Sequence, residues 1–526
     1  MGKKRMPFQT LKFGDNLIPK YWNLVKIVDE KGQPTDYIGV RGEFEDPDTE
    51  NLFKFLVSQG KRVIGISSYQ NFPQLNCNPF QNPGYPQTRA DQFLTKYGDH
   101  VVLWCHCFRD TLAYFPASIP ALLYSESDQY PHGPVLYGIN EAKRFDCFVT
   151  IQDGAWNGWV RGLDILVRWV NFMADTLNLK VLVCGNNRKK NFSPRVTVID
   201  FQPWHLFLKA MSSAKFFLCA SGYDASPRVI LEAIGLNLPV LVNENILGGW
   251  KYINGYTGTF FNPVESIKKK IETFLTDINE GRYAPRRWMQ ENFNVEQNKA
   301  ELALTINCLT GLKYEDYIDA VLFINLAERK DRLADLGTEF ARMGIPDALI
   351  HRIEGIYDPD CGHLGCTQSH LKALAYARGK GYSRVLILED DFVFNLPRER
   401  LLFMLNEFYT ERGGAWDVFM FTTYWKTFYT ETETAFIRRV RTASTCAGYL
   451  VNGSAYQEIL RANFQESHDL LKAEVNSHRV ANPGKKLYET YYALDQHWRS
   501  LQARDKFYIS EPYFGRQSGS PSTIMK

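Results

Sequence analysis

Long apolar runs are missing from this sequence: no stretch approaches the ~20 consecutive apolar residues that span a bilayer. The amino terminus, Met1 to Pro7, is basic, but no apolar segment follows it, which argues against a secretory signal. A strong charge of one sign is missing as well, since the formal net charge is +3, and we find no nucleic-acid motif. We therefore expect neither a membrane-spanning protein nor a nucleic-acid-binding one.

Paired cysteine motifs are also missing. The ten cysteines are scattered over 526 residues, so they form no disulfide framework and indicate a reducing compartment. Two groupings, Cys105-His106-Cys107 and the segment from Cys361 to Cys366 around His363, contain residue types that bind zinc. Neither has the CxxC spacing of structural zinc sites, so zinc stays an alternative and is not the expectation.

The sequence does have a regular alternation of strand-like and helical segments. The chain is too long to form a single ordinary hydrophobic core, which indicates two or three domains. A content of 45% hydrophobic and 23% charged residues indicates that it is globular. Between residues 60 and 300 the alternation predicts doubly wound parallel sheets. The predicted strands are 61–66, 100–104, 120–124, 148–151, 180–185, 216–219 and 239–242, and the predicted helices include 162–177, 227–234 and 285–309.

Two boundaries divide this pattern. A break near residue 140 separates two predicted sheets. A second break lies near residues 311–317, where a helical segment ends before a new buried strand at 320–326. We therefore predict three domains, at residues 1–139, 140–312 and 316–526.

The most informative motif is an apolar run, 385–388, that ends in Glu389, Asp390 and Asp391. The run predicts a strand buried on both faces, and its C-terminal end is the edge where open α/β sheets bind ligands. Three adjacent carboxylates repel one another. A divalent cation that prefers hard oxygen ligands, such as Mn²⁺ or Mg²⁺, would neutralise them. A solvated acidic turn is the alternative.

Three further motifs belong to the same C-terminal region. INLAERKDR at 324–332 places two arginines after a predicted strand, and guanidinium groups match phosphate oxygens. GCTQSH at 365–370 precedes a predicted helix at 371–378, and a helix N-terminus attracts anions or sugars. The segment LDQHW at 494–498 combines an acid with an imidazole. Ordinary helix caps at Thr367 or Ser369 and a structural role for Asp495 are the alternatives.

Together these motifs resemble glycosyltransferase family 25, the lipooligosaccharide and collagen galactosyltransferase group with a GT-A fold. The resemblance covers about 200 residues and is also carried by CAGYLVNGSAY at 446–456, Pro512, Gln517 and SPSTI at 520–524. It implies a metal-dependent, inverting transfer of a sugar from a nucleotide donor, commonly UDP-galactose.

The resemblance implies a role for each motif. Glu389 and Asp391 would hold Mn²⁺ or Mg²⁺, with His497 completing the metal shell, because a cation offsets the charge that develops on a leaving diphosphate. Asp495 would be the base that deprotonates the acceptor hydroxyl. The residues expected to bind the nucleotide sugar are Asn325, Arg329, Arg332, Ser369, His370 and Asp390.

In the N-terminal half the informative segment runs from residue 221 to residue 235. Asp224 and Glu232 lie at the expected start and second turn of a helix. One carboxylate could bond a sugar hydroxyl and the other a ribose diol, while the helix N-terminus faces the phosphates. An N-capping Asp224 and a solvated Glu232 are the alternative.

This segment resembles the EX7E-type donor motif of GT-B glycosyltransferases, family 4 especially, with Asp224 in place of the first Glu. The likeness covers residues 140–310 well, whereas 1–139 match only in their general α/β pattern. It implies a catalytic role for Asp224 and nucleotide-sugar binding by Arg161, Arg228 and Glu232. The usual glycine-rich loop of the N-terminal lobe is not evident, which leaves the activity of this half open.

The predicted fold is α/β, with an N-terminal GT-B-like pair of Rossmann-type domains followed by a C-terminal GT-A domain. We expect an enzyme, a hexosyltransferase that acts on a glycan or glycoprotein acceptor, with the N-terminal unit as a second transferase. In one alternative only the C-terminal unit is catalytic and the GT-B-like unit is a degenerate glycan- or nucleotide-binding module. A scaffold without turnover is another. We expect a cytoplasmic location, in a bacterial cell or in a virus-infected host.

Overall fold

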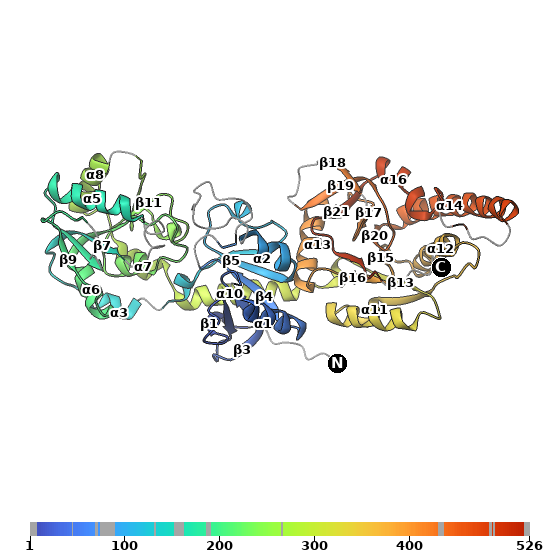
Figure 1. Cartoon of the computed structure of the whole chain (residues 1–526), viewed down its shortest axis with the longest axis horizontal. Helices are drawn as coiled ribbons and strands as arrows, with labels where there is room; N and C mark the ends of the chain where they lie inside the picture. Colours follow the sequence, from blue (N-terminus) through green and yellow to red (C-terminus); the bar gives the residue numbers. More distant parts are fainter. Residues whose placement is uncertain are drawn as a thin grey trace. The chain divides into compact units, whose positions relative to one another are not determined.

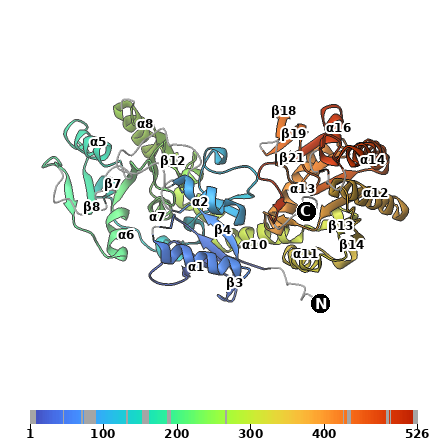
Figure 2. The same cartoon turned by 45° about the vertical axis from the view of Figure 1, so that its right-hand side comes forward.

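The protein is an α/β chain that divides into two compact units (Figures 1 and 2). Unit 1 comprises Met1–Gly98, Leu103–Phe115 and Ala121–Asn307, and unit 2 comprises Asp99–Val102, Pro116–Pro120 and Cys308–Lys526. The computed structural model describes residues 8–44, 46–68, 72–73, 90–130, 133–151, 162–185, 191–264, 267–424, 426–429, 436–482, 487 and 490–519. Within these ranges we find no helix that combines the length and the hydropathy needed to cross a membrane.

The first sheet of unit 1 has six strands in the order β1-β2-β3-β4-β5-β6. Strands β1 to β3 form an antiparallel meander that the sequence pattern did not predict, and β4 joins β3 in parallel. The strands are β1 (Lys12–Asn16), β2 (Leu24–Val28), β3 (Pro34–Val40), β4 (Arg62–Ile66), β5 (Val101–His106) and β6 (Ala121–Leu123), and the helices of this region are α1 (Pro47–Ser58) and α2 (Ala90–Tyr97). Helix α3 (Gly133–Tyr137) follows, and its Leu136 packs in the core of the second sheet.

The second sheet of unit 1 is parallel throughout, in the order β12-β11-β10-β7-β8-β9, which confirms the predicted strand–helix alternation. Its strands are β7 (Phe145–Ile151), β8 (Val181–Gly185), β9 (Thr197–Ile199), β10 (Ala214–Cys219), β11 (Val240–Asn243) and β12 (Gly258–Phe261), and its helices are α5 (Leu163–Asp175), α6 (Trp204–Ser212), α7 (Arg228–Gly235) and α8 (Ile267–Asn279).

Two helices replace the single one predicted at 285–309. They are α9 (Pro285–Asn292) and α10 (Val295–Gly311), and the chain is non-helical between them at Phe293. Helix α10 returns to the first sheet and lies beside β4 (Figures 1 and 2). The Leu11 amide donates to the Lys299 carbonyl at 3.1 Å, and the Asn307 side chain bonds both the amide and the carbonyl of Phe8. The end of unit 1 is thus tied to its beginning.

Unit 2 is built on a mixed sheet of eight strands in the order β14-β13-β15-β20-β17-β21-β19-β18. Strands β14, β13 and β15 are parallel, and β20 runs antiparallel to β15. The strands are β13 (Ala320–Asn325), β14 (Ile350–Glu354), β15 (Arg384–Glu389), β17 (Val418–Met420), β18 (Lys426–Tyr429), β19 (Ile437–Ala443), β20 (Gly448–Asn452) and β21 (Phe507–Ser510). The helices are α11 (Lys330–Met343), α12 (Gly362–Lys380), α13 (Arg398–Arg412), α14 (Ser454–Ala481), α15 (Leu494–His497) and α16 (Arg499–Arg504).

Side chains on β15 alternate between two separate cores, because successive residues of a strand point to opposite faces. Leu386 and Leu388 pack in the core that contains residues of α11 and α13. Val385 and Ile387 pack in the core that contains residues of α12 and α14. The same alternation, carried past the end of β15, directs Glu389 toward α12 and Asp390 toward α11.

A small second sheet, formed by β16 (Phe392–Phe394) and β22 (Gly515–Gln517), closes over the end of β15. Two glycines make room for the Phe392 ring. A Cβ at Gly448 would lie 2.6 Å from a ring carbon of Phe392, and a Cβ at Gly515 would lie 2.0 Å from another. The ring is therefore held between two strands, one residue after Asp391.

We expect Gly515→Ala to destabilise unit 2 by about 1–3 kcal/mol, because the new methyl group forces the Phe392 ring from its position. Gly337→Ala is the matched control. Gly337 is an exposed residue in α11, and a Cβ there would have no atom within 4 Å, so alanine should be neutral or stabilising by up to ~1 kcal/mol. Thermal or denaturant unfolding measures both. Equal midpoints for Gly515→Ala and the wild type would contradict the packing argument.

Candidate functional site

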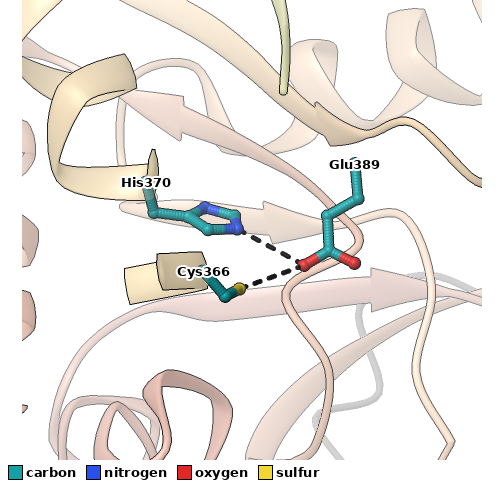
Figure 3. A group of neighbouring side chains, drawn as sticks. All are labelled: Cys366, His370 and Glu389. Carbon is teal, nitrogen blue, oxygen red and sulfur yellow. Dashed lines mark hydrogen bonds and ion pairs between the residues drawn. The ribbon is translucent and has the colours of Figure 1, made fainter. Parts of the chain in front are cut away.

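The three acids at the end of β15 separate toward different partners. Glu389 faces α12: its Oε1 lies 3.4 Å from His370 Nε2 and 3.7 Å from Cys366 Sγ (Figure 3). Its Oε2 accepts a hydrogen bond from Gln517 Nε2 at 3.4 Å. The two oxygens of this one carboxylate therefore face two different groups of side chains.

Asp390 points the other way and is 8% exposed. Its Oδ1 accepts from Arg332 Nη1 at 2.7 Å, and its Oδ2 accepts from Asn325 Nδ2 at 2.8 Å. Asn325 ends β13, the strand beside β15, and Arg332 lies in the first turn of α11. These three predicted nucleotide-binding residues thus bind one another, and a buried charge pair of this kind positions the strand ends.

Asp391 shares a partner with Glu389. Gln517 Nε2 lies 3.3 Å from Asp391 Oδ1, and Arg332 Nη2 lies 3.3 Å from Asp391 Oδ2. Burial and the nearby Glu389 charge raise the pKa of Asp391 to about 6, although Arg332 opposes the shift. The two carboxylates therefore form a site that favours an additional positive charge.

Asp495 is linked to these acids through two residues, Thr445 and Gln517. Its Oδ2 accepts from the Thr445 amide at 3.2 Å, and Thr445 Oγ1 donates to Gln517 Oε1 at 3.3 Å. Thr445 has a φ of 79°, a left-handed conformation that costs energy for a β-branched residue. A strained backbone of this kind persists only where its surroundings hold it in place. Here the strained residue, Thr445, connects Asp495 with Gln517.

Two predicted site residues have other partners in the structure. His497 Nε2 lies 3.4 Å from Glu466 Oε2, and Arg329 Nη2 lies 2.8 Å from Asp331 Oδ2. Their expected contacts, with a metal and with a nucleotide, stay predictions. Gln517 and Thr445 join the site, although sequence analysis assigned neither of them a role.

The prediction that residues 365–370 precede a helix is wrong, because α12 already begins at Gly362. Thr367 and Ser369 do not cap it: their hydroxyls donate to the carbonyls of His363 and Gly365, four residues earlier. Ser369 Oγ also accepts from the Ile356 amide at 2.8 Å, which ties the helix to the loop after β14. A Cβ at Gly365 would lie 2.4 Å from the Ile356 carbonyl oxygen, so glycine permits this close approach.

The acids at the end of β15 and several of their partners line one pocket in unit 2. Its walls come from the end of β13, the loop at 355–358, the first turns of α12 and the end of β15. The polar residues that line it include Arg332, Ser369, His370, Glu389, Asp391 and Gln517. An acidic rim at the carboxyl end of parallel strands is the position in which α/β sheets bind ligands.

A second pocket, in unit 1, contains Asp224, Arg228 and Glu232. Glu232 lies in the second turn of α7 and is 7% exposed, so the alternative of a solvated glutamate is wrong. Its Oε1 accepts from Trp204 Nε1 at 2.7 Å. Burial raises the pKa of Glu232, while the Trp204 hydrogen bond and the Arg228 charge act against the rise.

The remaining motif residues of unit 1 lie around α7. Asp224 precedes the helix, and its Oδ1 accepts from the Ser226 amide at 3.2 Å, but the N-cap position is Pro227. The alternative of an N-capping Asp224 is therefore wrong. Arg228 Nη2 lies 3.5 Å from Glu126 Oε2 and the guanidinium lies 4.7 Å from the centre of the Tyr130 ring. Arg161 lies outside the described residues.

Comparisons with known proteins add to this geometry. Residues 161–290 match the family model described as "Glycosyl transferases group 1", and this segment contains the unit 1 pocket residues Asp224, Arg228 and Glu232. We found no match among curated proteins.

Several solved structures are similar in part. A mutant of S. aureus TarM in complex with fondaparinux, alpha-GlcNAc-glycerol and UDP aligns with 13% identity and a TM-score of 0.37, over 48% of this chain and 53% of that one. Sucrose-phosphate synthase from Thermosynechococcus elongatus aligns with 16% identity and a TM-score of 0.38, over 50% and 72%. Anabaena HepE in complex with UDP-glucose aligns with 13% identity and a TM-score of 0.37, over 50% and 76%. The chain spans about half the length of TarM, and likenesses of this size support no inference about activity.

The family match indicates a glycosyltransferase domain, and hence an enzyme domain, at residues 161–290. The match covers strands β8 to β12 of the second sheet of unit 1, together with helices α5 to α8 and most of α9, whereas β7 lies before it. Residues 1–160 and 291–526 lie outside the match, so any function assigned to them must be argued from the geometry of their side chains.

We expect Asp391→Asn to stabilise the protein without added metal by about 3 kcal/mol at pH 7 to 8, because ~1.4 kcal/mol corresponds to each pH unit by which a pKa is displaced. The folded state raises the pKa of Asp391 from 3.8 to about 6, so ionisation opposes folding. The penalty is absent below pH ~4, develops between pH ~4 and ~6, and is complete above that range. Unfolding midpoints in a chelating buffer, measured from pH 4 to pH 8, test this.

Asp390→Asn is the contrasting control. It should destabilise the protein by about 3 kcal/mol, because it leaves the buried Arg332 without its closest carboxylate. The structure assigns Asp390 to a buried ion pair with Arg332 and leaves Glu389 and Asp391 facing the pocket. If Asp391→Asn and Asp390→Asn shift the unfolding midpoint in the same direction at pH 8, this assignment is incorrect.

Proposed function

We propose that the chain is a two-module glycosyltransferase. In this proposal unit 1 is a GT-B-like transferase related to family 4, and unit 2 is a GT-A transferase related to family 25. Both use nucleotide-sugar donors, with a UDP-hexose for unit 2, and both act on a glycan or glycoprotein acceptor. Two transferases in one chain suit successive additions to one glycan, since tethering raises the local concentration of the first product. The expected cytoplasmic location stays a prediction.

The observation that carries the proposal for unit 2 is the shared hydrogen bonding of Glu389, Asp391 and Gln517 at the end of β15. Asp495 is connected to the same glutamine through Thr445. A carboxylate fixed in this way can accept the proton of an acceptor hydroxyl, as an inverting transfer requires. Arg332 and Asn325 hold Asp390, and thereby keep its neighbours aimed into the pocket.

The residues of this site fit a divalent cation. Glu389 Oε2 and both Asp391 oxygens lie within 3.4 Å of one amide nitrogen, and burial together with the nearby Glu389 charge raises the pKa of Asp391. Hard carboxylate oxygens suit Mn²⁺ or Mg²⁺. When bound, such an ion supplies charge stabilisation for a leaving nucleoside diphosphate.

In unit 1 the proposal is supported by the family match and by the pocket that contains Asp224, Arg228 and Glu232. The Trp204 indole fixes one oxygen of Glu232, and the second oxygen can accept from a ribose hydroxyl. Asp224, on the loop before α7, is the carboxylate proposed to contact the transferred sugar. Arg228 supplies positive charge at the first residue of α7, where a diphosphate would also meet the helix N-terminus.

We expect two separable activities in a panel of nucleotide-sugar donors assayed with and without Mn²⁺. Asp391→Asn should abolish a metal-dependent activity, while Glu232→Gln should abolish a second activity on its own donor. Both variants keep an oxygen that accepts the existing Gln517 or Trp204 hydrogen bond, so the fold is preserved. Asp335→Asn and Glu30→Gln, at exposed acids of units 2 and 1, are the matched controls.

The pattern of losses separates the alternatives. If only Asp391→Asn matters, unit 1 is a binding module. If only Glu232→Gln matters, the proposed activity of unit 2 is wrong. If the wild type turns over no donor with or without Mn²⁺, the two-module proposal fails.

We expect Asp495→Asn to lower the kcat of the metal-dependent activity by ~10²–10⁴-fold with little change in donor KM, because it removes the proposed base and keeps the Thr445 hydrogen bond. Steady-state kinetics with a saturating acceptor measure this. A loss confined to donor KM would contradict the assignment of Asp495 as the base.

A further inference from the structure

Cys366, His370 and Glu389 form a cluster that the proposed function does not use as a unit (Figure 3). The Cys366 sulfur, a nitrogen of His370 and an oxygen of Glu389 all lie within 4.8 Å of one another. Thiolate, imidazole and carboxylate are the three ligand types that bind zinc in proteins. The cluster thus differs in chemistry from the all-oxygen pair of Glu389 and Asp391.

Local structure brings the three side chains together. Cys366 and His370 are four residues apart in α12, so they lie one above the other on the same face of the helix. Glu389 ends β15 on the sheet face that packs against α12. Figure 3 shows the thiol and the imidazole pointing toward the same carboxylate oxygen, Oε1.

His370 is held in the orientation that a metal ligand needs. The residue is fully buried, its Nδ1 lies 2.9 Å from the Tyr449 hydroxyl, and the two rings stack at 5.7 Å with an interplanar angle of 19°. A partner at one ring nitrogen fixes the ring and leaves the other nitrogen, Nε2, directed at the cluster. The Tyr449 hydroxyl here takes the place of the carboxylate, carbonyl or water that usually bonds the other nitrogen of a ligating histidine.

The cluster is also accessible, because Cys366, His370 and Glu389 all line the unit 2 pocket. Three protein ligands beside a pocket leave a further coordination position for water or for a ligand oxygen. A thiol packed only for its volume would be expected among apolar neighbours, whereas Cys366 faces a carboxylate and an imidazole.

We infer that Cys366, His370 and Glu389 bind a thiophilic divalent cation of the zinc type through the Oε1 side of Glu389. The Oε2 side remains turned toward Gln517 and Asp391, so Glu389 belongs to two sites of different ligand preference. Binding of the cation does not depend on the proposed transferase activity of unit 2. Only its connection with a donor in the same pocket rests on that proposal.

The test uses the full chain, freed of metal by a chelator and titrated with Co²⁺ as a spectroscopic substitute for Zn²⁺. We expect a thiolate-to-cobalt absorption band in the near ultraviolet that saturates and disappears when Zn²⁺ is added. Cys366→Ser should lose this band, and His370→Asn should weaken cobalt binding at least tenfold. Thermal melts of each variant show whether it is folded.

Cys361→Ser is the matched control, because Cys361 is a buried thiol at the start of the same helix that packs against Leu364 and Leu471. It should keep the band. Asp391→Asn should also keep the band while it loses the Mn²⁺-dependent activity, so a failure of the proposed function is distinguishable from a failure of this inference. A wild type without the band, or a band that survives Cys366→Ser, would overturn the inference.

Discussion

The structure of unit 2 depends on how three consecutive carboxylates are accommodated at the end of a buried strand. Alternation along β15 sends Asp390 toward α11 and Glu389 toward α12, so the charges do not meet on one face. Asp390 becomes a structural group in a buried pair with Arg332. Glu389 and Asp391 are left facing the pocket, and one glutamine amide bonds both of them. The different roles of these three carboxylates thus follow from the alternation of side chains along the strand.

Much of this arrangement could be predicted from local pattern. The apolar run before Glu389, the strand at 320–326 and most strands of the second sheet lie where their sequences indicate, because runs of apolar residues bounded by polar ones carry a strong strand signal. Long-range partners could not be predicted in the same way. Gln517 lies 128 residues from Glu389, and no local signal joins the two. The start of α12 was misplaced because glycine and serine suggest a boundary, whereas here they permit close packing against Ile356.

In unit 1, too, the local sequence pattern did not predict the tertiary contacts. The spacing of Asp224 and Glu232 indicated a donor motif, and the family match includes both residues. The spacing did not indicate that Glu232 would be buried against the indole of Trp204, which comes from a different helix, α6. Nor did it indicate the antiparallel meander of β1 to β3, whose short strands alternate too weakly to distinguish them from loops. Motif spacing singled out the candidate residues, and tertiary contacts determine how each of them is held.

The charge balance of the unit 2 pocket is the physical basis for proposing a cation there. Arg332 offers one positive charge, and its shorter contact, 2.7 Å, goes to Asp390, whereas its contact with Asp391 is 3.3 Å. The amide of Gln517, the thiol of Cys366 and the imidazole of His370 also bond the carboxylates of Glu389 and Asp391, and they donate hydrogen bonds without supplying a fixed charge. Hydrogen bonds alone offset only part of the cost of holding two carboxylates in a desolvated site. Without a metal, the close carboxylates of Glu389 and Asp391 therefore carry an unfavourable electrostatic free energy. A divalent cation bound between them would relieve it, and this relief would add to the affinity for the cation.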